Sequence, residues 1–184
     1  MGGVLSRRLV ELFRWVDPGP GSSHLVSDLS GWWRDPEVLA GVGPALAGLF
    51  PAARPTVVIA PEVTGLLLGP LVAVAAGAGF LPAYKDGGER RRIGPMRWEE
   101  TPPDYRGRQL RIGVDARRLG PGDRVLLADD WVATGAQLDA LHRLVRDSGA
   151  EFVGTAALVA TCPAPATERL RLRALLTEEQ LPEA

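Results

Sequence analysis

Short apolar segments alternate with helical patterns through the middle of the sequence, and this alternation limits the possible folds most strongly. The strands that we expect cover residues 56–60, 80–84, 124–128 and 152–160. Helical spacing of apolar residues predicts helices over 65–78 and 137–148, between these strands. This order predicts an α/β fold with an open, mainly parallel sheet flanked by helices. Ligands bind such sheets beyond the carboxyl ends of the strands.

The length of 184 residues fits a single domain with three parts. Residues 1–54 are expected to be mainly helical, and one helix opens where Asp35 can cap it and Pro36 can occupy its first turn. Residues 55–160 form the α/β core, and residues 161–184 form a helical tail. The segment 86–108 is rich in glycine, proline and arginine, so we expect a long loop that is functional or mobile.

Charge and cysteine content exclude several classes of protein. The formal net charge is -1, so the chain lacks the basic surface on which non-specific nucleic-acid binding relies. The longest apolar stretch, 66–81, is short for a membrane span and is interrupted by glycine and proline. The single cysteine, Cys162, cannot form an internal disulfide. We therefore expect a cytoplasmic protein without a nucleic-acid or membrane partner.

The most informative motif joins the segment 124–128 to the helix that follows it. Asp129 and Asp130 directly follow the apolar segment, and small residues around Thr134 precede the helix. Backbone N–H groups and the positive end of the helix dipole favour a phosphate at such a loop. Two adjacent carboxylates can accept hydrogen bonds from neighbouring ribose hydroxyls. We therefore expect a sugar-phosphate site, and the alternative is that the two acids only cap a strand end.

The sequence Asp-Asp-Trp-Val-Ala-Thr-Gly at 129–135 resembles the phosphoribosyl pyrophosphate (PRPP) signature of the type I phosphoribosyltransferases. Segments 59–70 and 76–85 are similar to a turn, helix and strand of the adenine branch, and 28–36 matches the spacing of another of its segments. The resemblance covers residues 17–160. It implies the fold of that family and the transfer of a 5-phosphoribosyl group from PRPP to a purine-like base, with release of pyrophosphate.

The resemblance also implies a role for each matching position. Asp129 and Asp130 would hold the ribose hydroxyls of PRPP, and Lys85 would reach its pyrophosphate as a point charge. The residues that would cradle the 5-phosphate are Ala133, Thr134, Gly135, Ala136 and Gln137. The turn at the pyrophosphate would contain Glu62, Val63 and Thr64, and Glu62 is the acid best placed for proton work.

Cofactor and partners follow from the same resemblance. Mg²⁺ would arrive bound mainly to PRPP oxygens, because the sequence offers no dedicated cage of carboxylates. The partners would be PRPP and a nucleobase or nucleotide, and the protein would form a homodimer. The segment 86–108 would be a mobile hood that excludes water while the ribose becomes an oxocarbenium-like cation.

Composition supports Lys85 independently, because it is the single lysine among 21 basic residues. A retained lysine suggests a site where a compact ammonium is needed instead of a planar guanidinium. The alternative is an incidental lysine at a strand end. Arg90, Arg91 and Arg92 could grip pyrophosphate or form a solvated cluster, and His24 could line a base pocket.

Four positions depart from the family pattern. Thr64 stands where arginine is usual, Gln137 where a small hydroxyl residue is usual, and Val26 where an aromatic residue stacks on the base. Arg111 lies where the adenine branch has an acidic hood motif. These departures predict slow turnover, another heterocyclic acceptor or a non-catalytic sensor of PRPP or nucleotide; the enzyme ranks first because the acid pair, the loop and Lys85 are kept. Trp131 either packs under the loop or narrows the site.

Overall fold

The computed structural model describes residues 2–20, 25–87, 94–102 and 109–183. Its helices are α1 (Gly2–Leu12), α2 (Ser30–Arg34), α3 (Pro36–Gly48), α4 (Gly65–Ala76), α5 (Ala136–Asp147), α6 (Ala164–Arg169) and the 3₁₀ helix η1 (Glu178–Gln180). Its strands are β1 (Arg14–Val16), β2 (Val26–Asp28), β3 (Val57–Pro61), β4 (Gly79–Lys85), β5 (Met96–Glu100), β6 (Arg111–Asp115), β7 (Arg124–Val132), β8 (Glu151–Ala160) and β9 (Leu172–Thr177).

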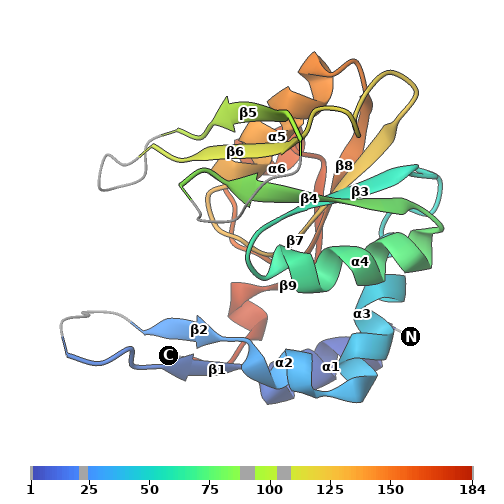
Figure 1. Ribbon diagram of the computed structural model, residues 1–184. Coiled ribbons are helices and arrows are strands. Elements are labelled where there is room, and N and C mark those ends of the chain that lie inside the picture. The colour runs from blue at the N-terminus through green and yellow to red at the C-terminus, as the bar shows by residue number, and fades with distance from the viewer. Residues whose placement is uncertain (1, 21–24, 88–93, 103–108, 184) are drawn as a thin grey trace.

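Within the described residues, seven strands form the main sheet in the order β5-β6-β4-β3-β7-β8-β9 (Figure 1). Strands β4, β3, β7, β8 and β9 run parallel to one another. Strand β6 is antiparallel to β4 and to β5, so β5 and β6 form a hairpin at one edge. The mainly parallel α/β sheet predicted from the alternation of strands and helices is confirmed.

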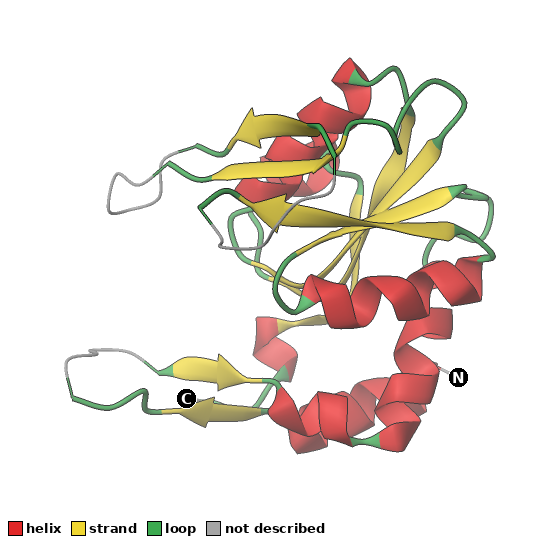
Figure 2. Cartoon of the chain, viewed as in Figure 1, coloured by secondary structure: helices red, strands yellow, loops and turns green. Residues whose placement is uncertain are grey.

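Strands β3 and β7 are parallel and lie side by side at the centre of the sheet. From β3 the chain continues to β4 on one side, and from β7 it continues to β8 on the other side. Helix α4 leads from β3 to β4, whereas α5 leads from β7 to β8, and the two helices cover opposite faces of the sheet (Figure 2). Such a reversal opens a crevice beyond the carboxyl ends of the two strands, where ligands of open α/β sheets bind.

Buried apolar residues lie on both faces of the sheet. On one face, α4 packs against β3 and β7, and α3 packs against α4 and β8, around Leu46, Leu68 and Leu126; α1 packs against α3 and β9. On the other face, α5 packs around Leu127, Leu141 and Leu144. All six leucines are at most 1% exposed. These two layers hold the crevice between β3 and β7 on rigid elements.

The N-terminal part combines three helices with the β1–β2 hairpin. The expected cap of α3 is confirmed: the Asp35 carboxylate accepts hydrogen bonds from the backbone N–H groups of Glu37 and Val38, each at 2.9 Å. The Arg8 guanidinium also donates to Asp35 at 2.6 Å, which fastens α1 to α3. None of the helices in the described part of the chain is long and apolar enough to cross a membrane.

Three expectations about the elements were wrong. The segment 86–108 contains β5, an edge strand that pairs with β6. Its polar sequence lacks the alternating pattern that would have predicted a strand. Strand β7 continues to Val132, because the ten-residue β8 is long enough to pair with it there, so the acid pair lies within the strand and not after it. The tail 161–184 is only partly helical, since Leu172–Thr177 forms β9 in parallel with β8.

Candidate functional site

The acid pair lies near the carboxyl end of β7, in the crevice that the sheet topology creates. Asp129 pairs in register with Ala157 of β8, and both acids are half-buried. The backbone N–H of Asp130 donates to Oδ1 of Asp129 at 3.0 Å. Because the strand continues on both sides of the pair, the two carboxyl groups are held on rigid backbone.

The pKa of Asp129 is raised well above its ordinary value, chiefly because burial disfavours the charged carboxylate. The nearby charge of Asp130 raises it further, whereas the positive charge of Lys85 lowers it. Burial and the neighbouring acid therefore favour the protonated form of Asp129 relative to a free carboxyl group. A ligand that donates hydrogen bonds or brings positive charge favours its ionised form.

The small-residue loop between β7 and α5 forms a tight turn. Gly135 precedes α5 with φ +77°, and an added Cβ would lie 2.9 Å from Leu170 Cδ1 and 3.3 Å from Cys162 Sγ. Only glycine satisfies both the left-handed backbone and this close packing. Thr134 Oγ1 accepts a 3.3 Å hydrogen bond from the N–H of Ala136 at the start of the helix.

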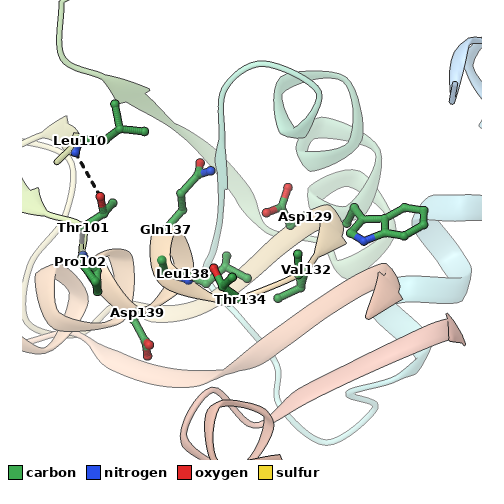
Figure 3. Close-up of a pocket in the computed structure, with 13 residues that line it drawn as sticks. Thr101, Pro102, Leu110, Asp129, Val132, Thr134, Gln137, Leu138 and Asp139 are labelled. Carbon is green, nitrogen blue, oxygen red and sulfur yellow. Dashed lines mark hydrogen bonds between the residues drawn. The ribbon is translucent and has the colours of Figure 1, made fainter. Parts of the chain in front are cut away.

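A cavity of about 480 Å³ opens over this loop (Figure 3). Its lining residues are Thr101, Pro102, Leu110, Asp129, Trp131, Val132, Ala133, Thr134, Gly135, Ala136, Gln137, Leu138 and Asp139. It thus joins all five predicted cradle residues to one of the two acids. The cavity offers the start of a twelve-residue helix, loop N–H groups and a hydroxyl, a donor set suited to a phosphate.

Gln137 extends from the first turn of α5, and in Figure 3 its amide reaches toward the space between Leu110 and Asp129. Thr101 and Leu110 form the opposite wall, where the N–H of Leu110 donates to Thr101 Oγ1 at 3.2 Å. The amide therefore occupies cavity space that a small hydroxyl residue would leave open.

The turn after β3 carries the other predicted site residues. Glu62 Oε1 accepts a 2.6 Å hydrogen bond from the backbone N–H of Lys85, which joins the ends of β3 and β4. Thr64 directly precedes α4, and Val63 is 72% exposed. These four residues do not line the 480 Å³ cavity. Because β3 pairs in parallel with both β4 and β7, the turn after β3 lies at the same edge of the sheet as the acid pair.

The structure shows the surroundings of Arg111 and Val26, two of the positions that depart from the family pattern. Arg111 lies on β6 outside the cavity lining, where its guanidinium contacts the Asp86 carboxylate at 3.0 Å and lies over the ring of Trp98. Its charge is thus balanced by the acid that directly follows β4. Val26 lies on β2 and is 42% exposed.

Trp131 contributes to the cavity lining and also packs against the N-terminal part. Its ring centroid lies 5.9 Å from those of Phe13 and Trp15. Trp15 in turn donates from Nε1 to the carbonyl of Pro182 at 2.9 Å. The indole therefore connects the strand of the acid pair to the β1–β2 hairpin.

Some predicted site residues lie outside the part of the chain that the structure describes, and some cavity residues were not predicted. His24, Arg90, Arg91, Arg92 and part of the expected hood, 88–93 and 103–108, lie outside the described residues. The missed cavity residues are Thr101, Pro102, Leu110, Val132, Leu138 and Asp139. Asp139 follows the cradle by two residues and could have been found from that spacing, whereas the opposite wall has no local signal.

The carboxylates of the site suit a cation that a substrate brings. Among the residues that the structure describes, no group of three or more histidine, cysteine, aspartate or glutamate side chains is arranged to hold a metal ion. Asp129 and Asp130 supply hard oxygen donors beside the phosphate cradle, and Mg²⁺ is commonly held by one or two carboxylates together with substrate phosphates. The residues present fit such an ion.

Known proteins resemble this chain along most of its length, although no family model matches it. It is 32% identical over 142 residues to adenine phosphoribosyltransferase of Desulfitobacterium hafniense strain Y51, an alignment that covers 77% of this chain and 78% of that relative. Adenine phosphoribosyltransferase of Rhodothermus marinus has a similar structure, with a TM-score of 0.80, 29% identity and coverage of 95% and 99% of the two chains. The APRTase of Giardia lamblia, solved with 9-deazaadenine, gives a TM-score of 0.80 at 26% identity and covers 94% and 97%.

Proposed function

Because this chain belongs to the adenine phosphoribosyltransferase family, we propose that adenine is the base that it converts to a nucleoside monophosphate. The chain is a phosphoribosyltransferase that transfers the 5-phosphoribosyl group of PRPP to a purine and releases pyrophosphate. The choice of adenine is supported by the names of its relatives and by the 9-deazaadenine bound to the Giardia lamblia enzyme.

One observation carries the proposal: the acid pair of β7 lies next to a phosphate-type cavity in the crevice between β3 and β7. In this arrangement the 5-phosphate lies at the start of α5, the ribose hydroxyls face Asp129 and Asp130, and the pyrophosphate extends toward the turn after β3. Lys85 lies at the end of β4, beside that turn. Each part of PRPP thus meets side chains of suitable charge.

The reaction forms a bond between a ring nitrogen of the base and C1 of the ribose and breaks the bond from C1 to pyrophosphate oxygen. The proton of that nitrogen passes to the released pyrophosphate or to water. Positive charge develops on the ribose, and the carboxylates of Asp129 and Asp130 lie where they stabilise it. The Lys85 ammonium balances charge on the leaving pyrophosphate. Catalysis by this chain is therefore mainly positioning and electrostatics.

Mg²⁺ is the cofactor that we propose, carried to the site on PRPP. When bound, it would screen the charge of the pyrophosphate oxygens. Asp129 and Asp130 are the residues that would contact it or its water ligands. The position of Asp129 in the cavity lining, with Asp130 next to it in β7, supports this proposal.

The decisive experiment incubates the protein with PRPP, Mg²⁺ and one base at a time, and measures pyrophosphate release and the nucleotide formed. The bases are adenine, hypoxanthine, guanine and uracil. Release with adenine at the ordinary enzyme scale of about 1–1000 per second supports the proposal. Pyrophosphate release with another base instead of adenine would identify that base as the acceptor. Saturable PRPP binding without release would identify a sensor.

We also propose a cytoplasmic homodimer. Helix α4 is apolar on nearly all sides. Its Leu67 and Val74, seven residues apart on one stripe of the helix, are 53% and 82% exposed, and Val63 in the turn before the helix is 72% exposed. A helix of this kind is normally buried, so a second copy of the chain is the partner that we propose for this stripe. The cytoplasmic location is supported by the single cysteine, Cys162, which is free.

A further inference from the structure

A carboxylate lies in the wall of the phosphate cavity, where it would repel the substrate. Asp139 is in the first two turns of α5, and its N–H donates to the carbonyl of Gly135 at 2.8 Å. It follows the first helical residue by three positions, which is about 4.5 Å along the helix axis. An uncompensated negative charge in the first turns of the helix would repel a phosphate bound at the helix start and weaken binding.

Arg169 of α6 balances this carboxylate. Its Nε and Nη2 atoms donate to the two oxygens of Asp139 at 2.8 and 2.5 Å, a bidentate arrangement. The Asp139 side chain is 14% exposed and that of Arg169 is 50% exposed. Figure 3 shows the Asp139 carboxylate directed away from Gln137 and Asp129.

The position of Arg169 is set by packing against the cradle itself. Its neighbour Leu170 is fully buried, and the Leu170 side chain fills the space beside Gly135 that any Cβ would need. Cys162 and Ala166 of the same segment also lie within 4 Å of that point. The segment 162–170 therefore packs behind the loop between β7 and α5. It also places the Arg169 guanidinium against the carboxylate of Asp139 in α5.

We propose that Arg169 is a positioning residue for the 5-phosphate, because it draws the Asp139 carboxylate away from the phosphate cavity and cancels its charge. This inference rests on the proposed function, since it requires a phosphate in the cavity. The Asp139–Arg169 pair is therefore expected to affect binding of the 5-phosphate that PRPP and the nucleotide product both carry.

The test compares a ligand that carries the phosphate with one that lacks it. Affinities for AMP and adenosine are measured by calorimetry for the wild type, Arg169→Ala, Asp139→Asn and the double variant. Arg169→Ala should weaken AMP on the order of tenfold and leave adenosine unchanged, because the freed carboxylate repels only the phosphate. The double variant should recover most of the AMP affinity, since neither charge remains.

Asp139→Asn alone keeps the test valid if Arg169→Ala does not fold. It leaves Arg169 without its carboxylate partner beside the cavity, so AMP should bind several-fold more tightly in low salt, and the gain should shrink as ionic strength rises. Arg146→Ala is the control, because Arg146 is an exposed residue near the far end of α5 that contacts the neighbouring Asp147.

Three outcomes would overturn the inference. They are unchanged AMP affinity in Arg169→Ala, equal weakening of AMP and adenosine, and a double variant as weak as Arg169→Ala. The last two would identify the ion pair as a structural clamp between α5 and α6. If wild-type protein binds no AMP and releases no pyrophosphate, the proposed function itself fails, a result distinct from these three.

Discussion

The backbone N–H of Lys85 donates a 2.6 Å hydrogen bond to Oε1 of Glu62, so the last residue of β4 is fastened to the turn that follows β3. The N–H of Glu62 in turn donates to the carbonyl of Ala83 at 2.9 Å. This reciprocal pair of bonds fixes the path along which the Lys85 side chain leaves the sheet. In this structure Glu62 positions the strand end that carries the ammonium.

The contact separates two roles for Glu62. Glu62→Gln keeps an oxygen acceptor for the N–H of Lys85, so kcat and KM for PRPP should stay within about threefold of wild type, whereas Glu62→Ala leaves that N–H without its acceptor at a cost of about 1–3 kcal/mol. Steady-state kinetics of both variants decides the matter. A large fall in kcat for Glu62→Gln would instead assign proton transfer to the carboxylate.

The ribose contact can be tested at Asp130. Asp130→Asn should weaken PRPP binding by roughly 1–3 kcal/mol, because the anionic acceptor is lost while the shape is kept. Calorimetry with PRPP and Mg²⁺ measures this change, and Asp147→Asn at the exposed end of α5 is the control. Unchanged affinity in Asp130→Asn would exclude the acid pair as the ribose contact.

Sequence reasoning located this part of the site because its members are neighbours in the chain. An apolar strand, two acids, a small-residue loop and a helix start follow one another within 125–137, so one βα unit brings them together. The opposite wall could not be located in the same way. Thr101 and Leu110 reach the cavity only through the β5–β6 hairpin, whose polar strand β5 gives no alternating pattern.

The C-terminal elements were missed for a similar reason. The leucine-rich segment 170–176 is compatible with a helix, and its pairing with β8 depends on a strand that lies outside it in the sequence. The contacts of Trp131 with Phe13 and Trp15 also join residues more than 100 positions apart. Local pattern predicts elements, whereas these contacts depend on the assembled sheet.

Asp129 makes the stability of the fold depend on pH in a defined direction. Burial and Asp130 raise the pKa of Asp129 in the folded state above that of the unfolded chain. The folded state therefore binds the additional proton, so the stabilisation is complete below the unfolded pKa of about 3.9 and is lost as pH rises through the folded pKa. The free energy of unfolding should fall over this range.

Asp129→Asn removes this titration but keeps the oxygen that accepts the N–H of Asp130. The variant should be more stable than wild type at pH 8 by about 0.5–2 kcal/mol, the usual range for single stabilising changes. Urea denaturation between pH 4 and 8 measures the difference, which should shrink toward low pH. A difference independent of pH would contradict the assignment, and the loss of activity in the same variant reports its separate role in the site.

The exposed stripe of α4 tests the homodimer. Leu67→Glu places a charge on a residue that is 53% exposed in the single chain, so the fold should be kept while an interface between two copies is disrupted. Light scattering at several concentrations should show a dimer for wild type and a monomer for the variant. Val4→Glu, at a residue 73% exposed on α1, is the control. A dimer that persists in Leu67→Glu would place the interface elsewhere.

The β5–β6 hairpin is fastened to helix α5 by Arg143. This side chain of α5 donates from Nε to Glu99 Oε2 at 3.2 Å and from Nη2 to the carbonyl of Glu100 at 2.5 Å. The next residue, Thr101, is 4% exposed, and its N–H donates to the carbonyl of Leu110 at 2.7 Å. Arg143 therefore holds the strand end that places Thr101 and Leu110 opposite the cradle.

Loss of this contact should loosen the wall without removing a group that touches the reacting atoms. Arg143→Ala should raise KM for PRPP about fivefold, the equivalent of one ordinary hydrogen bond, with kcat little changed. Arg143→Lys should recover part of the effect, because an ammonium can still reach one of the two acceptors. Arg117→Ala is the matched control, since Arg117 forms its ion pair with Asp115 inside the hairpin segment, at 2.7 Å, and does not bridge to α5. An equal rise of KM in Arg117→Ala would show that any weakening of the hairpin has this effect. A fall in kcat of Arg143→Ala with unchanged KM would instead assign Arg143 to the chemical step and not to the cavity wall.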